Sequence, residues 1–253
     1  MGTSLPHVVV TGASRGIGRA VALRFARQGY PVWALARSAA DLESLRAEVP
    51  DRVRPVVADG ADEAALRAAC KTILAEGAPA VLVNNAGIAP SAPLVKTSMA
   101  DFDQTMAINL RAPFVLCQEL VPGMVARKSG RIINMASTAG LRGFRYTSVY
   151  SASKHALVGL TKSLALELAQ SGVTVNAVCP GWVDTPMVAR AAERIQKLTG
   201  RTEEEARQAL SGMHPIGRFV RSEEVAEVCF FLASEQAAAI TGATYVIDGG
   251  ELA

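Results

Sequence analysis

Tyr150 and Lys154 are the two residues of this sequence whose types and spacing point most directly to chemistry. They stand four positions apart in a segment of helical pattern, which puts them on one face, one turn apart. A phenol with a pKa of about 10 exchanges protons poorly at neutral pH, but a neighbouring ammonium lowers that pKa by favouring the phenolate. The pair is therefore a candidate general acid and base, although a chain with four tyrosines can also contain this spacing by chance.

Ser137 and Asn109 extend this candidate site. Ser137 follows a strand-like segment, at the end where ligands collect in a parallel sheet, and its hydroxyl can hold a carbonyl oxygen while Tyr150 protonates it. The alternative is a turn serine that satisfies backbone groups. Asn109 stands four residues before Pro113, whose missing N–H leaves the Asn109 carbonyl without its helical donor. We expect an ordered water there, through which Asn109 holds a proton relay towards Lys154.

A glycine-rich turn, TGASRGIG at residues 11–18, follows the first strand-like run and opens a helix. Its glycines permit a tight turn and a close approach of the backbone to a ligand, while the helix N-terminus favours a pyrophosphate. The glycine spacing differs from the strict G-x-G-x-x-G fingerprint, and an ordinary strand-to-helix connection is the alternative. The cofactor-binding residues expected in this turn are Gly12, Ser14, Arg15, Gly16, Ile17 and Gly18.

The end of the second strand indicates which dinucleotide binds. An NAD-binding protein needs an acid there for the ribose 2′-hydroxyl, but this chain has Ala36 and Arg37. Arg15 and Arg37 can both present guanidinium groups to a 2′-phosphate, so NADP(H) is favoured over NAD(H). The alternative is that both arginines are solvated surface residues.

Strand-like and helical segments alternate along the chain and must position these residues. The expected strands are 7–11, 32–36, 53–58, 80–83, 131–135, 173–178 and 244–247, and the expected helices are 17–28, 41–48, 62–76, 103–126, 151–170 and 222–234. Several strands lack polar alternation, as expected where helices cover both faces of a parallel sheet. Because no linker divides the chain, we predict one α/β domain over residues 1–253, of doubly wound Rossmann type with a seven-stranded parallel sheet.

Residues 186–215 depart from this alternation, being helical in pattern with a charged run at 201–205. An insertion after a strand end is well placed to cover a ligand, so we predict a small helical substrate lid. A surface hairpin without ligand contact is the alternative. Met187, Val188, Ile195 and Leu198 indicate an apolar pocket.

The composition is that of a globular protein, with 50% apolar and 19% charged residues among 253. The net charge is +3 with no basic run, so we expect no nucleic-acid partner. The longest uncharged window is interrupted by prolines, so we expect no membrane span. Four widely separated cysteines match neither a zinc site nor a disulfide framework, which predicts reduced thiols, no metal site and a cytoplasmic location.

Taken together, these motifs resemble the short-chain dehydrogenase/reductase family over nearly the whole chain. The motifs are the turn at 11–18, Asn84-Asn85-Ala86-Gly87, Asn109, Ser137, Tyr150 with Lys154, Pro180-Gly181 and Asp248-Gly249-Gly250. The resemblance implies a catalytic tetrad in which Ser137 orients the carbonyl, Tyr150 transfers the proton, Lys154 binds the nicotinamide ribose and lowers the tyrosine pKa, and Asn109 anchors a relay water. It also implies that hydride comes from the cofactor.

The same resemblance implies further contacts with the cofactor. Asp59 is expected at the adenine with Gly60 beside it, Asn85 along the adenosine ribose, and Val183 and Thr185 at the nicotinamide carboxamide. The remaining cofactor-binding residues that it implies are Ala86, Gly87, Tyr150, Lys154, Pro180 and Gly181.

Residues 176–187 and 214–227 are similar to bacterial aromatic-polyketide ketoreductases, with 3-oxoacyl-carrier-protein reductases and 3-hydroxybutyrate dehydrogenases close behind. This similarity implies an NADPH-dependent carbonyl reductase of a 3-oxoacyl thioester or related β-keto substrate, free or carried on acyl carrier protein or coenzyme A. The alternatives are an NADP(H)-dependent alcohol dehydrogenase for a cyclic alcohol, steroid or sugar, a 3-hydroxyacyl dehydrogenase, and a non-catalytic NADPH-binding sensor.

The resemblance also bears on partners. Lys128 matches a carrier-docking position of the carrier-protein reductases, whereas Ser171 departs from the other. Arg142 and Arg145 could meet an anionic substrate, or be solvated loop arginines. The family further implies a homotetramer that packs through residues 103–126 and 151–170.

Overall fold

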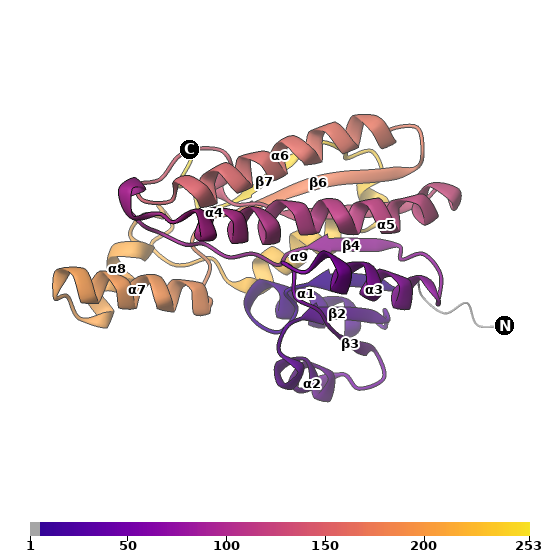
Figure 1. The fold of residues 1–253 in the computed structure, drawn as a ribbon, viewed down its shortest axis with the longest axis horizontal. Helices are drawn as coiled ribbons and strands as arrows, with labels where there is room; N and C mark the ends of the chain where they lie inside the picture. Colours follow the sequence, from indigo (N-terminus) through magenta and orange to yellow (C-terminus); the bar gives the residue numbers. More distant parts are fainter. Residues whose placement is uncertain (1–5) are drawn as a thin grey trace.

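A computed structural model describes residues 6–253, apart from the side chain of Leu198, and residues 1–5 of the predicted domain lie outside it (Figure 1). Within the described residues, seven strands form one parallel sheet in the order β3-β2-β1-β4-β5-β6-β7. The strands are β1 Val8–Thr11, β2 Val32–Ala36, β3 Val53–Val57, β4 Val81–Asn84, β5 Gly130–Met135, β6 Val173–Pro180 and β7 Thr244–Ile247. The predicted Rossmann-type sheet is confirmed.

Helices cover both faces of the sheet. They are α1 Gly16–Ala26, α2 Ala39–Glu48, α3 Glu63–Leu74, α4 Met99–Met106, α5 Ala112–Ala126, α6 Ser148–Leu168, α7 Pro186–Thr199, α8 Glu203–Ser211 and α9 Ser222–Leu232. Because successive strand residues point to opposite faces, Val8 and Val10 pack with α1, α2 and α9, whereas Val9 packs with α3, α5 and α6. Both faces are thereby buried, which explains why the strands read as continuous apolar runs.

The predicted helix over residues 103–126 is wrong in its start and in its continuity. The Ser98 hydroxyl accepts the Asp101 N–H at 3.0 Å, and this cap starts α4 at Met99. The segment Ala107–Arg111 is then π-helical, with the Ala112 N–H donating to the Ala107 carbonyl five residues earlier. Pro113 cannot donate to Asn109, so the α-helical ladder is interrupted at this point.

The strand order reverses between β1 and β4, which are neighbours in the sheet. In such sheets the crevice outside the carboxyl ends of the strands is where ligands bind. Thr11, Asn84 and Met135 end β1, β4 and β5 at this edge. β3 is an edge strand, as its central Pro55 requires, because proline has no N–H for a second neighbour.

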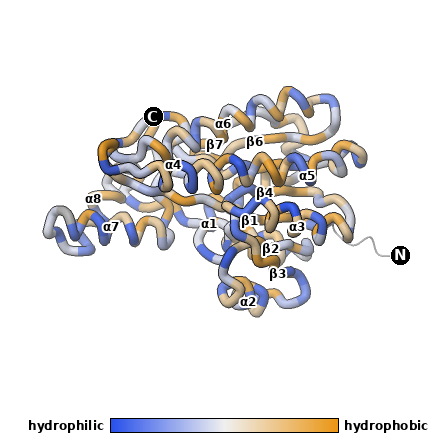
Figure 2. The backbone as a smooth tube through the Cα atoms, viewed as in Figure 1, coloured by the Kyte–Doolittle hydropathy of each residue, from blue (hydrophilic) through white to orange (hydrophobic). Residues whose placement is uncertain are grey.

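Residues 186–215 form two helices, α7 and α8, that extend beyond the sheet at one end of the molecule (Figure 1). Val188 and Ala192 of α7 pack with Ala206 and Leu210 of α8 in a small core of their own. Figure 2 shows hydrophobic and hydrophilic stretches alternating along this pair, as expected of helices with one buried face.

The cysteines are free and buried, as predicted. None of the helices in the described part of the chain has both the length and the apolar character needed to cross a bilayer.

Gly18 offers a test of how closely α1 approaches the turn before it. A Cβ at Gly18 would lie 2.2 Å from the Gly12 carbonyl oxygen. We therefore expect Gly18→Ala to lower the free energy of unfolding by roughly 1–3 kcal/mol, measured by urea denaturation. The control is Gly159→Ala in α6, where an added Cβ meets nothing within 4 Å, and this change should raise stability by roughly 0.5–1 kcal/mol. Wild-type stability of Gly18→Ala would contradict the close approach.

Candidate active site

A cavity of about 590 Å³ lies at the carboxyl edge of the sheet, from the turn after β1 to the start of α7. Three of the expected catalytic residues line it, namely Ser137, Tyr150 and Lys154. The expected cofactor-binding residues that line it are Gly12, Ser14, Arg15, Gly16, Ile17, Arg37, Asp59, Gly60, Asn85, Ala86, Gly87, Tyr150, Lys154, Pro180, Gly181, Val183 and Thr185. Of the expected residues, Asn109 and Gly18 lie behind the wall, where Asn109 is fully buried.

The turn after β1 needs glycine for two separate reasons. Gly12 and Gly16 have φ of +64° and +54°, a left-handed conformation that side chains disfavour. A Cβ at Gly12 would also lie 2.9 Å from the Ala86 Cα atom, so the turn touches the segment after β4. The glycines thus allow the turn after β1 and the segment after β4 to lie in contact at the base of the cavity.

Thr11, which the sequence analysis did not single out, joins these two loops. Its hydroxyl accepts the N–H groups of Asn85 at 2.9 Å and Ala86 at 3.0 Å. In return, the Asn85 side-chain amide donates to the Thr11 carbonyl at 2.9 Å and the Gly12 carbonyl at 3.3 Å. Asn85 therefore lines the cavity and also holds the turn. In the sequence, the feature that could have identified Thr11 is its place as a polar residue at the end of an otherwise apolar strand.

Two arginines and an aspartate stand at the outer end of the cavity. Arg37, whose side chain is 58% exposed, has its Nη1 atom 3.9 Å from an Asp59 carboxylate oxygen. The other Asp59 oxygen accepts the Ala61 N–H at 2.9 Å, which fixes the carboxylate. Arg15 is exposed at the N-terminus of α1. This end of the cavity therefore has two guanidinium groups and a helix N-terminus available to a phosphate.

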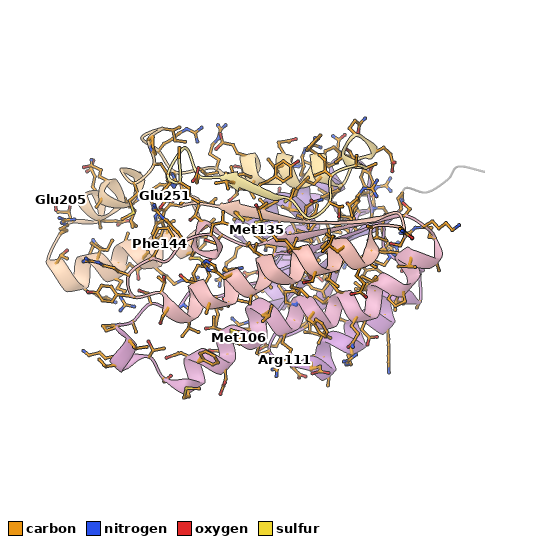
Figure 3. The ribbon with its side chains drawn as sticks, turned by 90° about the horizontal axis from the view of Figure 1, so that it is seen from above. Met106, Arg111, Met135, Phe144, Glu205 and Glu251 are labelled. Atoms are coloured by element: carbon orange, nitrogen blue, oxygen red, sulfur yellow. The ribbon has the colours of Figure 1, made fainter. Side chains whose placement is uncertain are left out.

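The inner end of the cavity carries the hydroxyl groups and the amine. The Lys154 ammonium is buried, donates to the Met135 carbonyl at 2.7 Å and lies 5.8 Å from the centre of the Tyr150 ring. Figure 3 shows Met135 beside α6, the helix that carries both residues. Ser137 follows β5, and its hydroxyl accepts the Ala139 N–H at 3.1 Å.

Asn109 lies in the π-helical segment between Met106 and Arg111, alongside α6 (Figure 3). Its amide donates to the Ile88 carbonyl at 2.9 Å and the Ser153 hydroxyl at 3.0 Å, and its Oδ1 atom accepts the Ile88 N–H at 2.9 Å. Asn109 thereby ties the loop after Gly87 to the helix of Tyr150 and Lys154. The water relay through its carbonyl stays a prediction.

Comparison with known proteins places this geometry in a family. Residues 12–251 match a family model described as enoyl-(acyl carrier protein) reductase. The chain is 40% identical over 252 residues to the granaticin polyketide synthase putative ketoacyl reductase 1 of Streptomyces violaceoruber, covering 97% of this chain and 92% of the relative. It is 38% identical over 246 residues to the 3-oxoacyl-[acyl-carrier-protein] reductase of Thermotoga maritima, covering 96% of both. The chain belongs to the short-chain dehydrogenase/reductase family.

A solved structure agrees with this assignment. A variant of actinorhodin polyketide ketoreductase with NADPH superimposes with a TM-score of 0.94 and 36% identity, covering 99% of both chains. The fold therefore matches that of this ketoreductase over nearly the whole chain.

Burial governs the protonation of the inner residues in this short-chain dehydrogenase/reductase. Burial raises the pKa of Tyr150 above its usual value, and the Ser137 hydroxyl acts in the opposite direction. The lowering of the Tyr150 pKa by Lys154 stays a prediction. Burial also lowers the pKa of Lys154 to about 8, because its ammonium is removed from water and the Met135 carbonyl replaces only part of its hydration.

The predicted lid residues divide between the cavity and the small core. Met187 and Val188 line the cavity, while Ile195 packs against the core between α7 and α8, and the Leu198 side chain lies outside the described residues. From α7, Arg194 donates a hydrogen bond to the carbonyl of Ser91, in the loop that follows β4.

The expected partner-binding residues lie in two separate groups. Arg142 is engaged by Glu251 at 3.0 Å and lies 4.7 Å from the centre of the Phe144 ring, whereas Arg145 is exposed. Lys128 and Ser171 precede β5 and β6, so they lie at the amino edge of the sheet, opposite the cavity.

The lowered pKa of Lys154 predicts a pH dependence of stability. The folded-state pKa of about 8 lies below the model-compound value of 10.5, so the cost of burying the charge is fully present below about pH 8 and is relieved as pH rises towards 10.5. Between pH 7 and pH 9.5 the free energy of unfolding should therefore rise by roughly 2 kcal/mol more in the wild type than in Lys154→Met, measured by urea denaturation. Parallel pH profiles would contradict a buried, titrating lysine.

Proposed function

We propose that this short-chain dehydrogenase/reductase is an NADPH-dependent carbonyl reductase that acts on a 3-oxoacyl thioester or related β-keto compound. The observation that carries the proposal is that Ser137, Tyr150 and the buried Lys154 line the same cavity as the glycine turn after β1. The names of two relatives, a putative ketoacyl reductase and a 3-oxoacyl-[acyl-carrier-protein] reductase, support this substrate class.

The residues at the outer end fit a phosphorylated dinucleotide. A Cβ at Gly12 would collide with the segment after β4, and the left-handed φ of Gly12 and Gly16 leaves the backbone close to any ligand in the cavity. Arg15 and Arg37 would hold a 2′-phosphate, with Asp59 at the adenine, and Val183 and Thr185 would meet the nicotinamide. When bound, NADPH supplies the hydride.

The inner residues would handle the proton that must reach the carbonyl oxygen as hydride reaches its carbon. The Ser137 and Tyr150 hydroxyls can both donate to one oxygen, and the raised pKa of Tyr150 keeps its proton in place until that oxygen becomes basic. Lys154 would bind the nicotinamide ribose and assist proton return to Tyr150, with Asn109 anchoring the relay water. The Ser137 and Tyr150 hydroxyls line the same cavity and would stabilise the charge that develops on the oxygen of a carbonyl group as it is reduced.

We further propose that α7 and α8 act as a substrate lid on a single domain, and that the protein works in the cytoplasm as a homotetramer. The bond from Arg194 to the Ser91 carbonyl joins α7 to the loop after β4, whose Ile88 lines the cavity. Phe114 on α5 and Leu166 on α6 are 48% and 82% exposed, which gives both helices apolar surface for a second copy. In this proposal the substrate is free or carried on acyl carrier protein or coenzyme A. Lys128, which matches a carrier-docking position, lies with Ser171 at the amino edge of the sheet, opposite the cavity.

Tyr150→Phe tests the proton-transfer role and separates a reductase from a sensor. We expect kcat for acetoacetyl-CoA to fall by about 10²–10⁴-fold, because the general acid is lost, while the Kd for NADPH changes by less than about threefold. The measurements are NADPH oxidation at 340 nm and NADPH fluorescence. Tyr146→Phe is the matched control, because Tyr146 is exposed and should keep wild-type turnover. Full activity in Tyr150→Phe would rule out the mechanism.

Arg37→Asp tests the cofactor assignment. Replacing the guanidinium by a carboxylate should weaken NADPH binding by roughly 10–100-fold and leave NADH binding unchanged or improved, measured as Kd values by fluorescence titration. Arg46→Asp makes the same charge change on α2, outside the lining of the cavity, and should leave the preference unaltered. An unchanged ratio of the two Kd values in Arg37→Asp would remove the 2′-phosphate role.

A further inference from the structure

His214 is a buried histidine, 1% exposed, in the segment between α8 and α9. Its Nδ1 atom lies 3.0 Å from the Arg218 carbonyl oxygen, and its Nε2 atom lies 3.0 Å from the Trp182 backbone nitrogen. A carbonyl only accepts and an amide N–H only donates, so Nδ1 carries the proton and Nε2 accepts. Two backbone groups thus fix one neutral tautomer of the ring.

The amide that His214 accepts belongs to the wall of the cavity. Pro180, Gly181 and Trp182 line the cavity after β6, and a Cβ at Gly181 would lie 2.6 Å from the His214 Nε2 atom. The Trp182 carbonyl in turn accepts the Val220 N–H at 3.0 Å, and the Trp182 side chain packs against the α7–α8 core. The imidazole therefore lies directly behind the Gly181–Trp182 wall. A shift of this wall away from the imidazole would break the hydrogen bond from the Trp182 N–H to Nε2.

Glu251 packs against this histidine. Its side chain is 2% exposed, and its Oε2 atom lies 3.7 Å from His214 Nε2 with no hydrogen-bond partner among the described residues. Its Oε1 atom accepts from Arg142 at 3.0 Å. Burial raises the pKa of Glu251, although Arg142 acts against this rise. An orphaned carboxylate oxygen in a buried position is costly, so its presence calls for a reason.

Arg142 belongs to the loop that follows Ser137. Its backbone N–H donates to the Thr138 carbonyl at 3.1 Å, and its guanidinium lies over the Phe144 ring. Figure 3 shows Glu251 and Phe144 near each other at the end of the molecule where α7 and α8 lie. A chain of side chains thus runs from the serine loop to the Trp182 amide, with a hydrogen bond between Arg142 and Glu251 and a packing contact, without a hydrogen bond, between Glu251 and His214.

We propose that His214 is a positioning residue for carbonyl reduction, which holds the Gly181–Trp182 wall through the Trp182 amide, while Glu251, bonded to Arg142 of the loop after Ser137, packs against the imidazole and limits its movement. This inference rests on the proposed function, in which the wall faces the nicotinamide and the serine loop faces the substrate carbonyl. The chain of side chains fixes the spacing between the hydride donor and the hydroxyl groups. An error of about 1 Å in such a spacing can cost on the order of 10²-fold in rate.

Two substitutions of His214 test this role. His214→Gln keeps a side-chain acceptor for the Trp182 N–H, whereas His214→Leu keeps the bulk and removes the acceptor. We expect His214→Leu to lower kcat for acetoacetyl-CoA by about 10–100-fold with the Kd for NADPH within about threefold of wild type, and His214→Gln to recover much of that loss. Amide hydrogen exchange of Trp182 should be fast in His214→Leu and protected in His214→Gln and wild type.

Glu251→Gln tests the connection to the serine loop, with Glu227→Gln on exposed α9 surface as the matched control. Glu251→Gln should lower kcat severalfold, and combining it with Arg142→Met should cost little more than either change alone, because both break the same chain. The control should behave as wild type.

The outcomes separate this inference from the proposed function. Wild-type kcat in His214→Leu, equal losses in the Leu and Gln variants, or a kcat that falls only in proportion to NADPH affinity would overturn the positioning role. If the wild type reduces no carbonyl compound, the proposed function fails, and Trp182 amide exchange in the two His214 variants still decides whether the histidine holds the wall.

Discussion

The close contact between the turn after β1 and the segment after β4 is the constraint on which the cavity depends. Thr11 bonds both Asn85 and Ala86, and a side chain at Gly12 would push the two segments apart. These segments come from strands that are neighbours only because the strand order reverses between them. The sheet topology thus creates the crevice. The hydrogen bonds of the Thr11 hydroxyl and the absence of a side chain at Gly12 then allow the two segments to meet at the base of the cavity.

Burial sets the chemistry of the inner end more than pairwise charge does. Lys154 donates to a backbone carbonyl and is buried, which lowers its pKa to about 8, and burial also raises the pKa of Tyr150. Asn109 lies behind these residues and has its side chain fully bonded to Ile88 and Ser153. These bonds hold the Asn109 side chain between the loop after Gly87 and the helix that carries Tyr150 and Lys154.

The sequence alone predicted the sheet because fully buried parallel strands leave continuous apolar runs that need no tertiary information to recognise. It also located Ser137, Tyr150 and Lys154, since strand ends and helix faces follow from local spacing. The start of α4 was missed although Ser98 and Asp101 form a cap, and the π-helical turn was not foreseen although Pro113 signalled a defect. The ring tautomer of His214 and the unpaired oxygen of Glu251 could not be predicted from the sequence, because they depend on contacts between segments that only the folded chain brings together.

Pro55 in the edge strand β3 has a consequence for how copies of this chain avoid one another. A parallel sheet forms slowly and exposes unpaired strand edges while it assembles, and such edges are templates for aggregation. A strand with proline at its centre cannot supply a full row of donors to an incoming chain, so accidental sheet extension is blocked at that end. Among the described strands, β7 forms the other edge of the sheet and contains no proline, so the two edges differ in how readily they can accept a further strand.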